Sequence, residues 1–479
     1  MSFSVKDITK AIPQRVITIA LFAVLGLLFF NQIGNTLIKF FDDTFHITII
    51  KDFALRGDIL DLRDPFLGLM YFEKPPFMIV LSAAGLKLFG FNSFGAKIFI
   101  VLYCFLSLVI GYVVLRKHTS ERTAILATII TGCAQQILHF SRRVGFDGVL
   151  AASLYIAFIF FYFAQERRWY YYMFGLTLGL AAMTKGVSGI IPVAALGMYL
   201  LVSPNGRARF RHPELYLSVI PFALVVAPWH IGMLMRHGDS FVTMYFWRRQ
   251  MSYFLPGNMI VQNMPSWGWE VSAKKILENY WPALPLFIYG IYRTIRDIVT
   301  KRFDNISDLR LYALTWFAVI FAVYQAASVK RYAYILPVYG AMGVLAAASL
   351  AGRKYEKQVV IFFSVWALLL GIVSFTPLWK EMDGSGWEEH RPVLERLAKD
   401  GQPYALFPAY PGGVTWLYNG YAFHAPSFTN VSADSLVPFY TSCGRIVLAT
   451  NDIALLPAPI RDNAVEVFRT NGLVIVQKK

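Results

Sequence analysis

The chain has 479 residues, of which 56% are hydrophobic and 16% aromatic. A soluble protein of this length cannot bury that much apolar surface, so the composition excludes a soluble globular enzyme and indicates a membrane protein with many spans. The net charge of +16 comes largely from Lys and Arg residues that flank the apolar runs, which is typical of a topology signal and argues against a nucleic-acid-binding protein.

The first apolar run, from Val16 to Phe30, lacks a small-residue cleavage site after it. We therefore interpret it as a retained transmembrane helix rather than a cleaved signal peptide. The segment 34–93 follows, and its polar character places it at a membrane surface. Its last part, from Phe77 to Phe91, is apolar but short and contains Lys87, so we predict a helix that lies in the interface rather than a crossing.

Ten further apolar runs are predicted to cross the membrane, which gives about eleven spans. They lie at about 94–115, 123–140, 148–164, 170–184, 189–203, 215–235, 280–295, 311–328, 335–351 and 359–379. If 77–91 does not cross, the loops rich in Lys and Arg alternate with the loops that contain the unusual polar motifs. The positive-inside rule then places the basic loops in the cytoplasm and the motifs outside it.

The last hundred residues differ in character from the rest. They contain short β-like runs at Arg445–Ala449 and Leu473–Val476 and a helical stretch near Arg391–Lys399. We predict two domains: a transmembrane domain, 1–379, whose catalytic first outer loop is 34–93, and a small extracytoplasmic α/β domain, 380–479.

Two acidic sites stand at the ends of predicted spans on the outer side. Asp42 and Asp43 are adjacent, and Asp147 lies at the entrance to the span 148–164. Adjacent carboxylates repel each other and are costly to desolvate, so they need a cation, a proton or a catalytic role. A helix cap is the alternative interpretation for each. Because the acids share a face with several cations, we predict a catalytic site.

Four charged pairs put cations on the side that the positive-inside rule disfavours. They are Glu73-Lys74, Arg142-Arg143, Arg248-Arg249 and Lys330-Arg331. Each pair alone is explained by a surface ion pair or a lipid-headgroup contact. Together they fit recognition of an anion, and phosphate is the usual anion at a membrane. Lys185, in contrast, is interpreted as a helix-end residue that reaches for the membrane surface.

These motifs resemble those of the C-type (GT-C) glycosyltransferases, which use polyprenyl-phosphate sugars. The resemblance covers most of the chain up to about residue 350. The bacterial lipid A aminoarabinose transferases are the more similar group, and the protein O-mannosyltransferases are more distant. The resemblance rests on four motifs. They are the acidic pair after the first span, the box Tyr71-Phe72-Glu73-Lys74-Pro75-Pro76, the acid in the second outer loop and the late box from Lys330 to Pro337. It implies an all-α polytopic membrane protein with the GT-C fold and interfacial helices.

Roles are carried over by position. Asp42 resembles the essential first-loop aspartate of the family and Asp147 its second acid, and the resemblance implies that Lys74 and Tyr334 hold the lipid phosphate. Asp43 is added as a third catalytic candidate. The further phosphate-binding candidates are Arg142, Arg143, Arg248, Arg249, Lys330 and Arg331, with Glu73, Tyr71 and Pro75 as support within the motif.

The chain departs from the aminoarabinose enzymes at two places. Where they continue the acidic pair with Thr-Arg-Tyr, this chain has Thr44-Phe45-His46, so one phosphate-binding Arg is missing. Where they have Glu-His after Phe-Trp-x, this chain has Arg249-Gln250, and that histidine resembles a zinc ligand of the family. We therefore assign no metal ligand and do not expect a structural zinc. No cofactor is certain, and use of a divalent metal stays open. We predict that Arg248 and Arg249 replace the lost cation.

The sequence thus predicts a glycosyltransferase that moves a hexosyl or pentosyl group from an undecaprenyl-type polyprenyl phosphate to a lipid or glycan acceptor, with inversion. The expected location is the outer, periplasmic face of the bacterial cytoplasmic (inner) membrane, and lipid A modification of lipopolysaccharide is the activity that the resemblance implies. A protein O-glycosyltransferase, with a protein acceptor, is one alternative. A flippase for an anionic lipid-linked substrate is another, disfavoured because transporters place functional charges near the bilayer midplane. Membrane lipids are expected partners, and nucleic acid is not.

Overall fold

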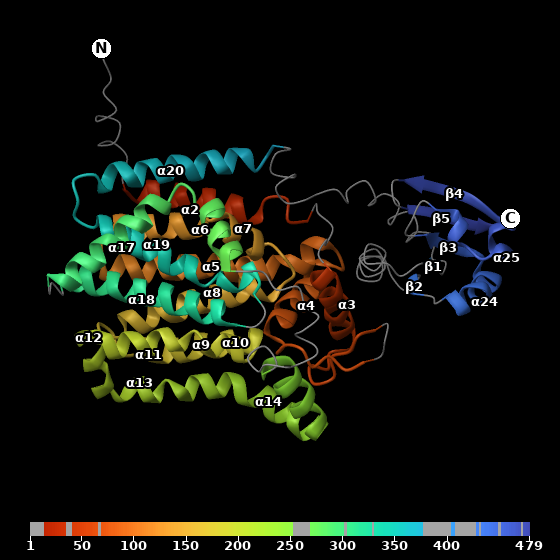
Figure 1. Cartoon of the computed structure of the whole chain (residues 1–479), viewed down its shortest axis with the longest axis horizontal. Coiled ribbons are helices and arrows are strands. Elements are labelled where there is room, and N and C mark those ends of the chain that lie inside the picture. The colour runs from red at the N-terminus through yellow and green to blue at the C-terminus, as the bar shows by residue number, and fades with distance from the viewer. Residues whose placement is uncertain are drawn as a thin grey trace, which may run out of the picture.

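The computed structural model describes residues 14–34, 41–65, 69–251, 269–300, 304–327, 330–376, 404–407, 428–430, 433–448, 452–470 and 473–479. Figure 1 shows a body of packed helices and a small C-terminal sheet. The predicted boundary between two domains at residue 379 lies outside the described residues, so it stays a prediction.

The first half of the helical body follows the predicted order of apolar segments. Its elements are α2 (Gln14–Phe30), α3 (Phe41–Arg56), α4 (Phe77–Phe89), α5 (Ser93–His118), α6 (Glu121–Gly132), α7 (Gln135–Ser141), α8 (Phe146–Phe163), α9 (Tyr170–Lys185), α10 (Val187–Ile190), α11 (Val193–Val202), α12 (Pro204–Ala208) and η1 (Arg209–Arg211). The second half contains α13 (Pro213–Leu217), α14 (Val219–Phe241), the π-helix η2 (Val242–Met251), α16 (Trp269–Asn279), α17 (Leu284–Val299), α18 (Asn305–Ala326), η3 (Tyr332–Ile335), α19 (Val338–Leu350) and α20 (Glu356–Val373).

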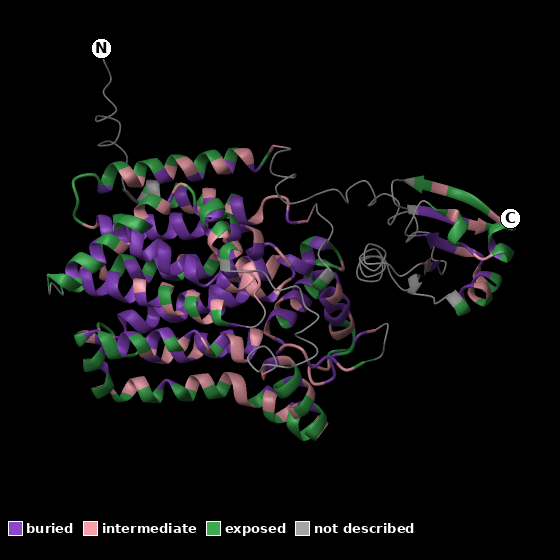
Figure 2. Cartoon of the chain, viewed as in Figure 1, coloured by how far each residue is buried: buried purple, intermediate pink, exposed green. Residues whose placement is uncertain are grey.

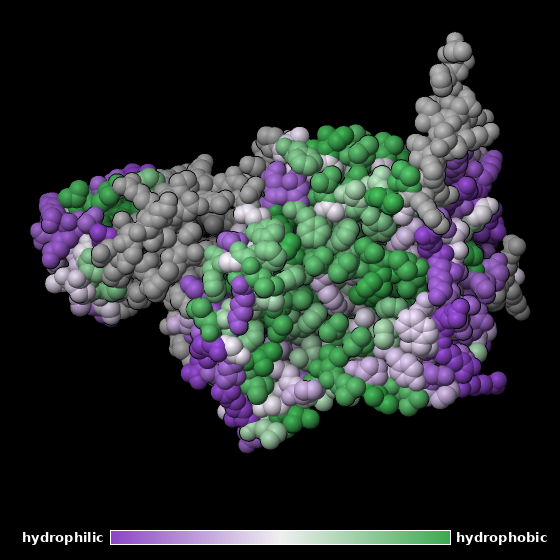
Figure 3. Space-filling view, turned by 180° about the vertical axis from the view of Figure 1, so that it is seen from behind, coloured by the Kyte–Doolittle hydropathy of each residue, from purple (hydrophilic) through white to green (hydrophobic). Residues whose placement is uncertain are grey.

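Six helices within the described residues are long and apolar enough to cross a membrane, and two bent helix pairs raise the number to as many as eight. The six are α5, α8, the run from α13 to η2, α18, the run from η3 to α19, and α20. The bent pairs are α6 with α7, at 66°, and the segment Val187–Val202 with Pro204–Arg211, at 99°. On the face that Figure 3 shows, hydrophobic residues cover the middle of the helical body and hydrophilic residues lie toward its two ends. The mostly helical polytopic fold is confirmed, whereas the count of eleven spans stays a prediction.

Helix α4 has the length expected of an interfacial helix. Its 13 residues extend about 20 Å, which is short of the roughly 30 Å of a bilayer core. It packs with α3 and α5 in a small core that includes Ile50, Met78 and Ile100. Helices α3 and α4 therefore form a folded unit beside the long helices.

The centre of the body is α8, which is buried along nearly its whole length (Figure 2). It packs against α5 and α9, and α7 crosses its N-terminal end. A Cβ atom at Gly148 would lie 2.3 Å from the carbonyl oxygen of Phe140, so only glycine permits this approach. The close crossing fixes the turn between α7 and α8, where Arg143 and Asp147 lie.

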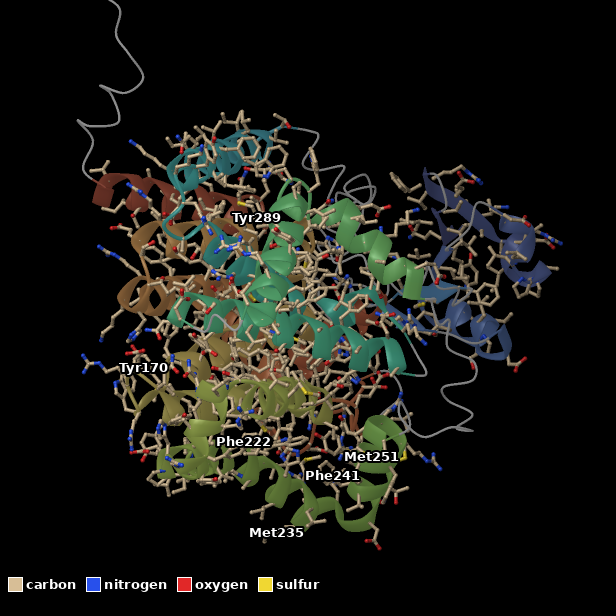
Figure 4. All side chains as sticks on the ribbon, turned by 60° about the vertical axis from the view of Figure 1, so that its left-hand side comes forward. Tyr170, Phe222, Met235, Phe241, Met251 and Tyr289 are labelled. Carbon is tan, nitrogen blue, oxygen red and sulfur yellow. The ribbon has the colours of Figure 1, made fainter. Side chains whose placement is uncertain are left out.

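The loops rich in Lys and Arg share one end of the body, which we call the basic end (residues 118–121, 164–169, 203–214, 297–300, 304–310 and 348–356). Thr18 at the start of α2 donates to Glu121 at 3.0 Å, and Ser120 contacts Glu356 at the start of α20. Arg168 pairs with Glu214 at 3.5 Å. Tyr170 lies at this end and Met251 at the opposite one (Figure 4). The alternation of loops predicted from the positive-inside rule is thus present in the fold.

The opposite end, which we call the motif end, contains residues 31–34, 42–46, 71–76, 142–147, 185–188, 249–250, 330–337 and 374. Asn31 after α2 donates to the carbonyl oxygen of Ser374 after α20 at 2.8 Å. Tyr324 donates to the carbonyl oxygen of Ser188 at 3.2 Å. The polar motifs of the sequence therefore lie on one side of the helical body, as predicted.

The C-terminal part contains a five-stranded sheet in the order β2-β1-β3-β5-β4. Its elements are β1 (Tyr404–Phe407), β2 (Phe428–Asn430), α24 (Ala433–Cys443), β3 (Arg445–Leu448), η5 (Ile453–Leu455), α25 (Ala458–Arg461), β4 (Ala464–Thr470) and β5 (Leu473–Lys478). β1 is parallel to β2 and β3, whereas β5 is antiparallel to β3 and β4. The β-like runs predicted from the sequence are confirmed as β3 and β5, and the predicted helical stretch 391–399 lies outside the described residues.

Candidate active site

The two adjacent aspartates at the start of α3 face different surroundings. Successive helical residues are turned by about 100°, so one carboxylate points inward while the other points out. Asp43 is buried and accepts two hydrogen bonds from Arg143, with Nε–Oδ2 at 2.7 Å and Nη2–Oδ1 at 2.9 Å. Asp42 is exposed. The acidic pair therefore divides into an inward carboxylate that has its own cation and an outward one that faces solvent.

The Asp43–Arg143 pair ties the start of α3 to the turn before α8. Burial raises the pKa of Asp43, and the charge and hydrogen bonds of Arg143 act in the opposite direction. A two-pronged guanidinium–carboxylate contact of this kind is geometrically specific, and removing one partner would leave a buried charge. Asp43 and Arg143 thus form a structural ion pair. The predicted roles of Asp43 in catalysis and of Arg143 in phosphate binding stay predictions.

Asp147, in the first turn of α8, forms an ion pair with Lys185, the last residue of α9. The ammonium group of Lys185 also lies 4.5 Å from the ring centroid of Tyr334. Tyr334 is within electrostatic range of both Asp147 and Asp42. These contacts bring together residues from the starts of α3 and α8, the end of α9 and η3. Lys185 is the last residue of α9, as predicted, but it pairs with Asp147 among the candidate site residues and does not reach for the membrane surface.

Lys74 lies in the loop before α4, within electrostatic range of Asp147, Lys185 and Arg249. Desolvation is the main cause that lowers the pKa of its amine, to about 8. Among the residues that the structure describes, no hydrogen bond or ion pair reaches the amine. An ammonium group has three donors, and leaving them all unused inside a protein is costly. This cation is therefore suited to donating hydrogen bonds to an anionic ligand.

Arg249, Gln250 and Glu73 form the side of the site next to Lys74. The guanidinium group of Arg249 pairs with the carboxylate of Glu73 at 2.7 Å. The buried side chain of Gln250 accepts from the backbone N–H of Val187 at 3.0 Å and donates to the carbonyl oxygen of Glu73 at 3.4 Å. The motif loop is thus attached to both η2 and the junction of α9 with α10.

The remaining predicted cations have protein contacts or are exposed. Arg142 is buried and donates to the carbonyl oxygens of Leu28 and Asn31, at 3.2 and 2.6 Å, so it caps the C-terminal end of α2. Lys330 donates to the carbonyl oxygen of Ala327 at 3.0 Å. Arg331 is partly exposed and within electrostatic range of Tyr334, and Arg248 is exposed. Within the motif box, Tyr71 and Pro75 are buried, in keeping with support of the loop.

Sequence reasoning gave His46 no role, yet the structure places it at the centre of the motif end. Its ring is buried against Phe146, with centroids 4.8 Å apart, and against Tyr71 at 5.9 Å. Neither ring nitrogen has a hydrogen-bond partner among the described residues. Burial, together with the charge of Lys74, lowers its pKa to about 3, so the imidazole is neutral near pH 7.

Several known proteins are similar to this chain. Residues 73–231 match the family model of dolichyl-phosphate-mannose-protein mannosyltransferases. An uncharacterized protein of Aquifex aeolicus is 23% identical over 72% of this chain and 66% of its own length. The undecaprenyl phosphate-alpha-4-amino-4-deoxy-L-arabinose arabinosyl transferase of Aeromonas salmonicida is 27% identical over 68% of this chain and 58% of its own length. The chain thus spans less than two thirds of the length of these curated relatives.

Solved structures match over nearly the whole chain. The structure of ArnT from Cupriavidus metallidurans bound to undecaprenyl phosphate has a TM-score of 0.77 at 17% identity, covering 97% of this chain and 98% of that one. The chain resembles the C-type glycosyltransferases and has their fold. The archaeal oligosaccharyltransferase AglB from Archaeoglobus fulgidus is also similar, with a TM-score of 0.57 at 12% identity over 91% of this chain and 69% of that chain. The predicted GT-C fold is therefore confirmed.

The zinc implied by the resemblance to GT-C enzymes does not fit the residues present. Glu73 is the carboxylate whose backbone Gln250 contacts, and the guanidinium group of Arg249 already lies 2.7 Å from it. Gln250 stands where the resemblance implies a histidine, and a neutral amide is a poor zinc ligand compared with imidazole. The described residues contain no group of three or more His, Cys, Asp or Glu side chains that could hold a metal ion.

Proposed function

We propose that the protein transfers a sugar from a polyprenyl phosphate, of the undecaprenyl type, to a lipid or glycan acceptor at the membrane surface. The observation that supports this most directly is Lys74. Its ammonium group has no hydrogen-bond or ion-pair partner in the described part of the chain, although the charges of Asp147 and Lys185 are close enough to act on it. The phosphate of the sugar donor is the anion that would accept hydrogen bonds from this ammonium group.

Charge develops on the departing lipid phosphate as the bond between the anomeric carbon and the phosphate oxygen breaks. The ammonium group of Lys74 and the hydroxyl group of Tyr334 would stabilise that charge. The acceptor oxygen forms the new bond to the anomeric carbon from the opposite side, which inverts the configuration. Asp42, which is exposed, would accept the proton of the acceptor hydroxyl and orient its oxygen. Where the acceptor is itself a phosphate, Asp42 would act by orientation alone.

The proposed site faces the periplasm of a bacterial inner membrane. The support is the clustering of Lys-rich and Arg-rich loops at the basic end, which the positive-inside rule assigns to the cytoplasm. Eleven crossings agree with this topology if the two bent pairs cross, together with α2, α9 and α17, which have 17, 16 and 16 residues. A 16-residue helix extends about 24 Å, which is enough for a locally thinned bilayer.

The test uses the purified chain in detergent with radiolabelled undecaprenyl-phosphate sugars, including aminoarabinose, and with lipid A or a core oligosaccharide as acceptor. The expected result is labelled acceptor whose formation requires Asp42 and Lys74. Labelled product that forms equally well with Asp42→Asn and Lys74→Met would overturn the assigned site, and an absence of product with every donor would overturn the proposed activity.

A protein acceptor is a second possibility, supported by the match to the protein mannosyltransferase model over residues 73–231. It predicts label on protein in the same assay when membrane extracts supply the acceptors. The flippase alternative predicts something different: translocation of the lipid-linked sugar across reconstituted vesicles with no glycosylated product. One set of labelled donors therefore separates the three functions.

A further inference from the structure

Gln250 is a buried amide that joins three segments far apart in the sequence. It lies near the end of η2 and is 4% exposed. Its side-chain oxygen accepts from the backbone N–H of Val187 at 3.0 Å, and its side-chain nitrogen donates to the carbonyl oxygen of Glu73 at 3.4 Å. A single side chain thus connects η2, the loop that contains Lys74, and the junction of α9 with α10.

The backbone around Gln250 is shaped to receive it. Gly186 has φ +59°, a conformation that favours glycine, and a Cβ atom there would lie 2.5 Å from the side-chain oxygen of Gln250. The same position would come within 2.7 Å of the hydroxyl oxygen of Tyr245, which precedes Gln250 in η2. Gly186 therefore leaves the space in which the amide meets the chain beyond α9.

The two residues that are hydrogen-bonded to Gln250 each lie within two positions of a cation of the site. Glu73 precedes Lys74, and Val187 is two residues after Lys185, which pairs with Asp147. Arg249 adds an ion pair to the carboxylate of Glu73 at 2.7 Å, so both the backbone and the side chain of Glu73 are attached to η2. One amide and one guanidinium group thus link the loop of Lys74 to η2, and the amide also links it to the segment that follows Lys185.

We infer that Gln250, assisted by Arg249, is a positioning residue that holds the ammonium groups of Lys74 and Lys185 toward one anion. This inference rests on the proposed function for the identity of the anion, a polyprenyl phosphate. Gln250 itself does not touch the phosphate in this assignment. It acts through Lys74, by fixing the loop from which that side chain projects.

The segment that presents Gln250 is attached to the same outer loop at a second place. The guanidinium group of Arg236, near the end of α14, pairs with Asp58 at 2.6 Å, and His237 contacts the carbonyl oxygen of Leu60 at 2.7 Å. Phe241, labelled in Figure 4, packs in the small cluster that also includes Phe72 of the motif box. The end of α14 and η2 therefore form one support for the first outer loop, and Gln250 is its contact with the site.

The experiment compares Gln250→Met, which keeps the length of the side chain but removes both hydrogen bonds, with Thr243→Val, an exposed control position on the same helix. We expect Gln250→Met to weaken binding of undecaprenyl phosphate about tenfold, the effect of losing one to two hydrogen bonds. The thermal midpoint should fall as well, because two buried backbone groups lose their partner, so binding is compared per folded molecule. In a Lys74→Met background the same change should have a clearly smaller effect, because most of the loss passes through the Lys74 ammonium group and only the part that passes through Lys185 remains. Full additivity of the two losses would overturn the inference.

A second measurement does not depend on the donor lipid. Amine-selective labelling, quantified at Lys74 by mass spectrometry, should be several-fold faster in Gln250→Met than in wild type or Thr243→Val, because the released loop exposes the amine. Equal labelling rates in all three proteins would overturn the positioning role. If labelling changes but undecaprenyl phosphate does not bind even the wild type, the positioning role stands and the proposed donor is wrong.

Discussion

The two ends of the helical body bury charged groups in different ways. At the basic end, Asp308 accepts hydrogen bonds from Ser203 at 2.6 Å and Tyr199 at 2.7 Å, and Arg310 pairs with Asp297 and donates to a backbone carbonyl oxygen. At the motif end, Lys74 has no hydrogen-bond or ion-pair partner among the described residues. Buried charges with protein partners stabilise the packing of helices, whereas a partly buried cation with unused donors is the group that an anion-binding site needs.

The comparison also explains why charge alone is a poor guide to function here. Arg209 at the basic end is almost fully buried, yet its guanidinium group donates to the carbonyl oxygens of Phe161 and Tyr162 and packs against three aromatic rings. Arg142 at the motif end is used in the same manner, on the end of α2. The useful distinction is therefore whether a buried charge has a partner within the protein.

The largest expected effect is that of Asp42→Asn. A general base contributes about 10²–10⁴-fold, so kcat should fall at least a hundredfold, while the thermal midpoint stays unchanged because Asp42 is exposed. The matched control at the basic end is Asp308→Asn, which weakens buried hydrogen bonds and should lower the thermal midpoint but leave the rate per folded molecule near that of wild type. The readouts are product formation and thermal unfolding in the same detergent. Similar kcat values for Asp42→Asn and wild type would remove Asp42 from the chemistry.

Lys74→Met is expected to have the next largest effect, on donor binding. Hydrogen bonds to charged groups contribute about 1.5–3 kcal/mol, so the Kd for undecaprenyl phosphate should rise roughly 10- to 100-fold. Lys87→Met on α4 removes an equally charged but exposed side chain and serves as the control. Direct binding of the lipid phosphate to the purified protein measures both. An effect of equal size at Lys87 would show that general charge, and not the site, governs binding.

A smaller effect is expected from pH. Because the pKa of the Lys74 amine is lowered to about 8, the amine is protonated below pH 8 and loses its charge above it. A phosphate monoester has its second pKa near 6 and does not titrate in this range. Affinity for the lipid phosphate should therefore decrease about fivefold between pH 8 and 9.

The matching control for the pH experiment is Lys74→Arg, since a guanidinium group stays charged throughout the range. Its affinity for undecaprenyl phosphate, whatever its absolute value, should be flat from pH 7 to 9. A wild-type profile as flat as that of the arginine variant would place the titrating group elsewhere. His46 does not contribute to the pH dependence of either affinity profile, because its pKa of about 3 keeps it neutral from pH 7 to 9.

The sequence predicted the sorting of residues between the two ends, because apolar length and Lys and Arg placement are both local properties. It also placed Asp147, Lys74 and Tyr334 in one site through the resemblance. It could not predict which carboxylate of the acidic pair turns inward to Arg143, since that depends on how α3 meets the turn before α8. The partner of Lys185 and the contacts of Gln250 were missed for the same reason: both join segments more than 35 residues apart.

The smallest expected effect on transfer comes from the buried ion pair at the basic end. Asp297→Ala leaves Arg310 charged and unpaired, which should lower the free energy of unfolding by about 3–5 kcal/mol. Replacing both residues, as Asp297→Leu with Arg310→Met, should recover most of that loss, because no buried charge is left unpaired. Thermal unfolding measures the stability, and binding of undecaprenyl phosphate should be unchanged in both variants. A shift in donor affinity would mean that α17, α18 and α19 couple the two ends, and the difference between a structural end and a binding end would no longer hold.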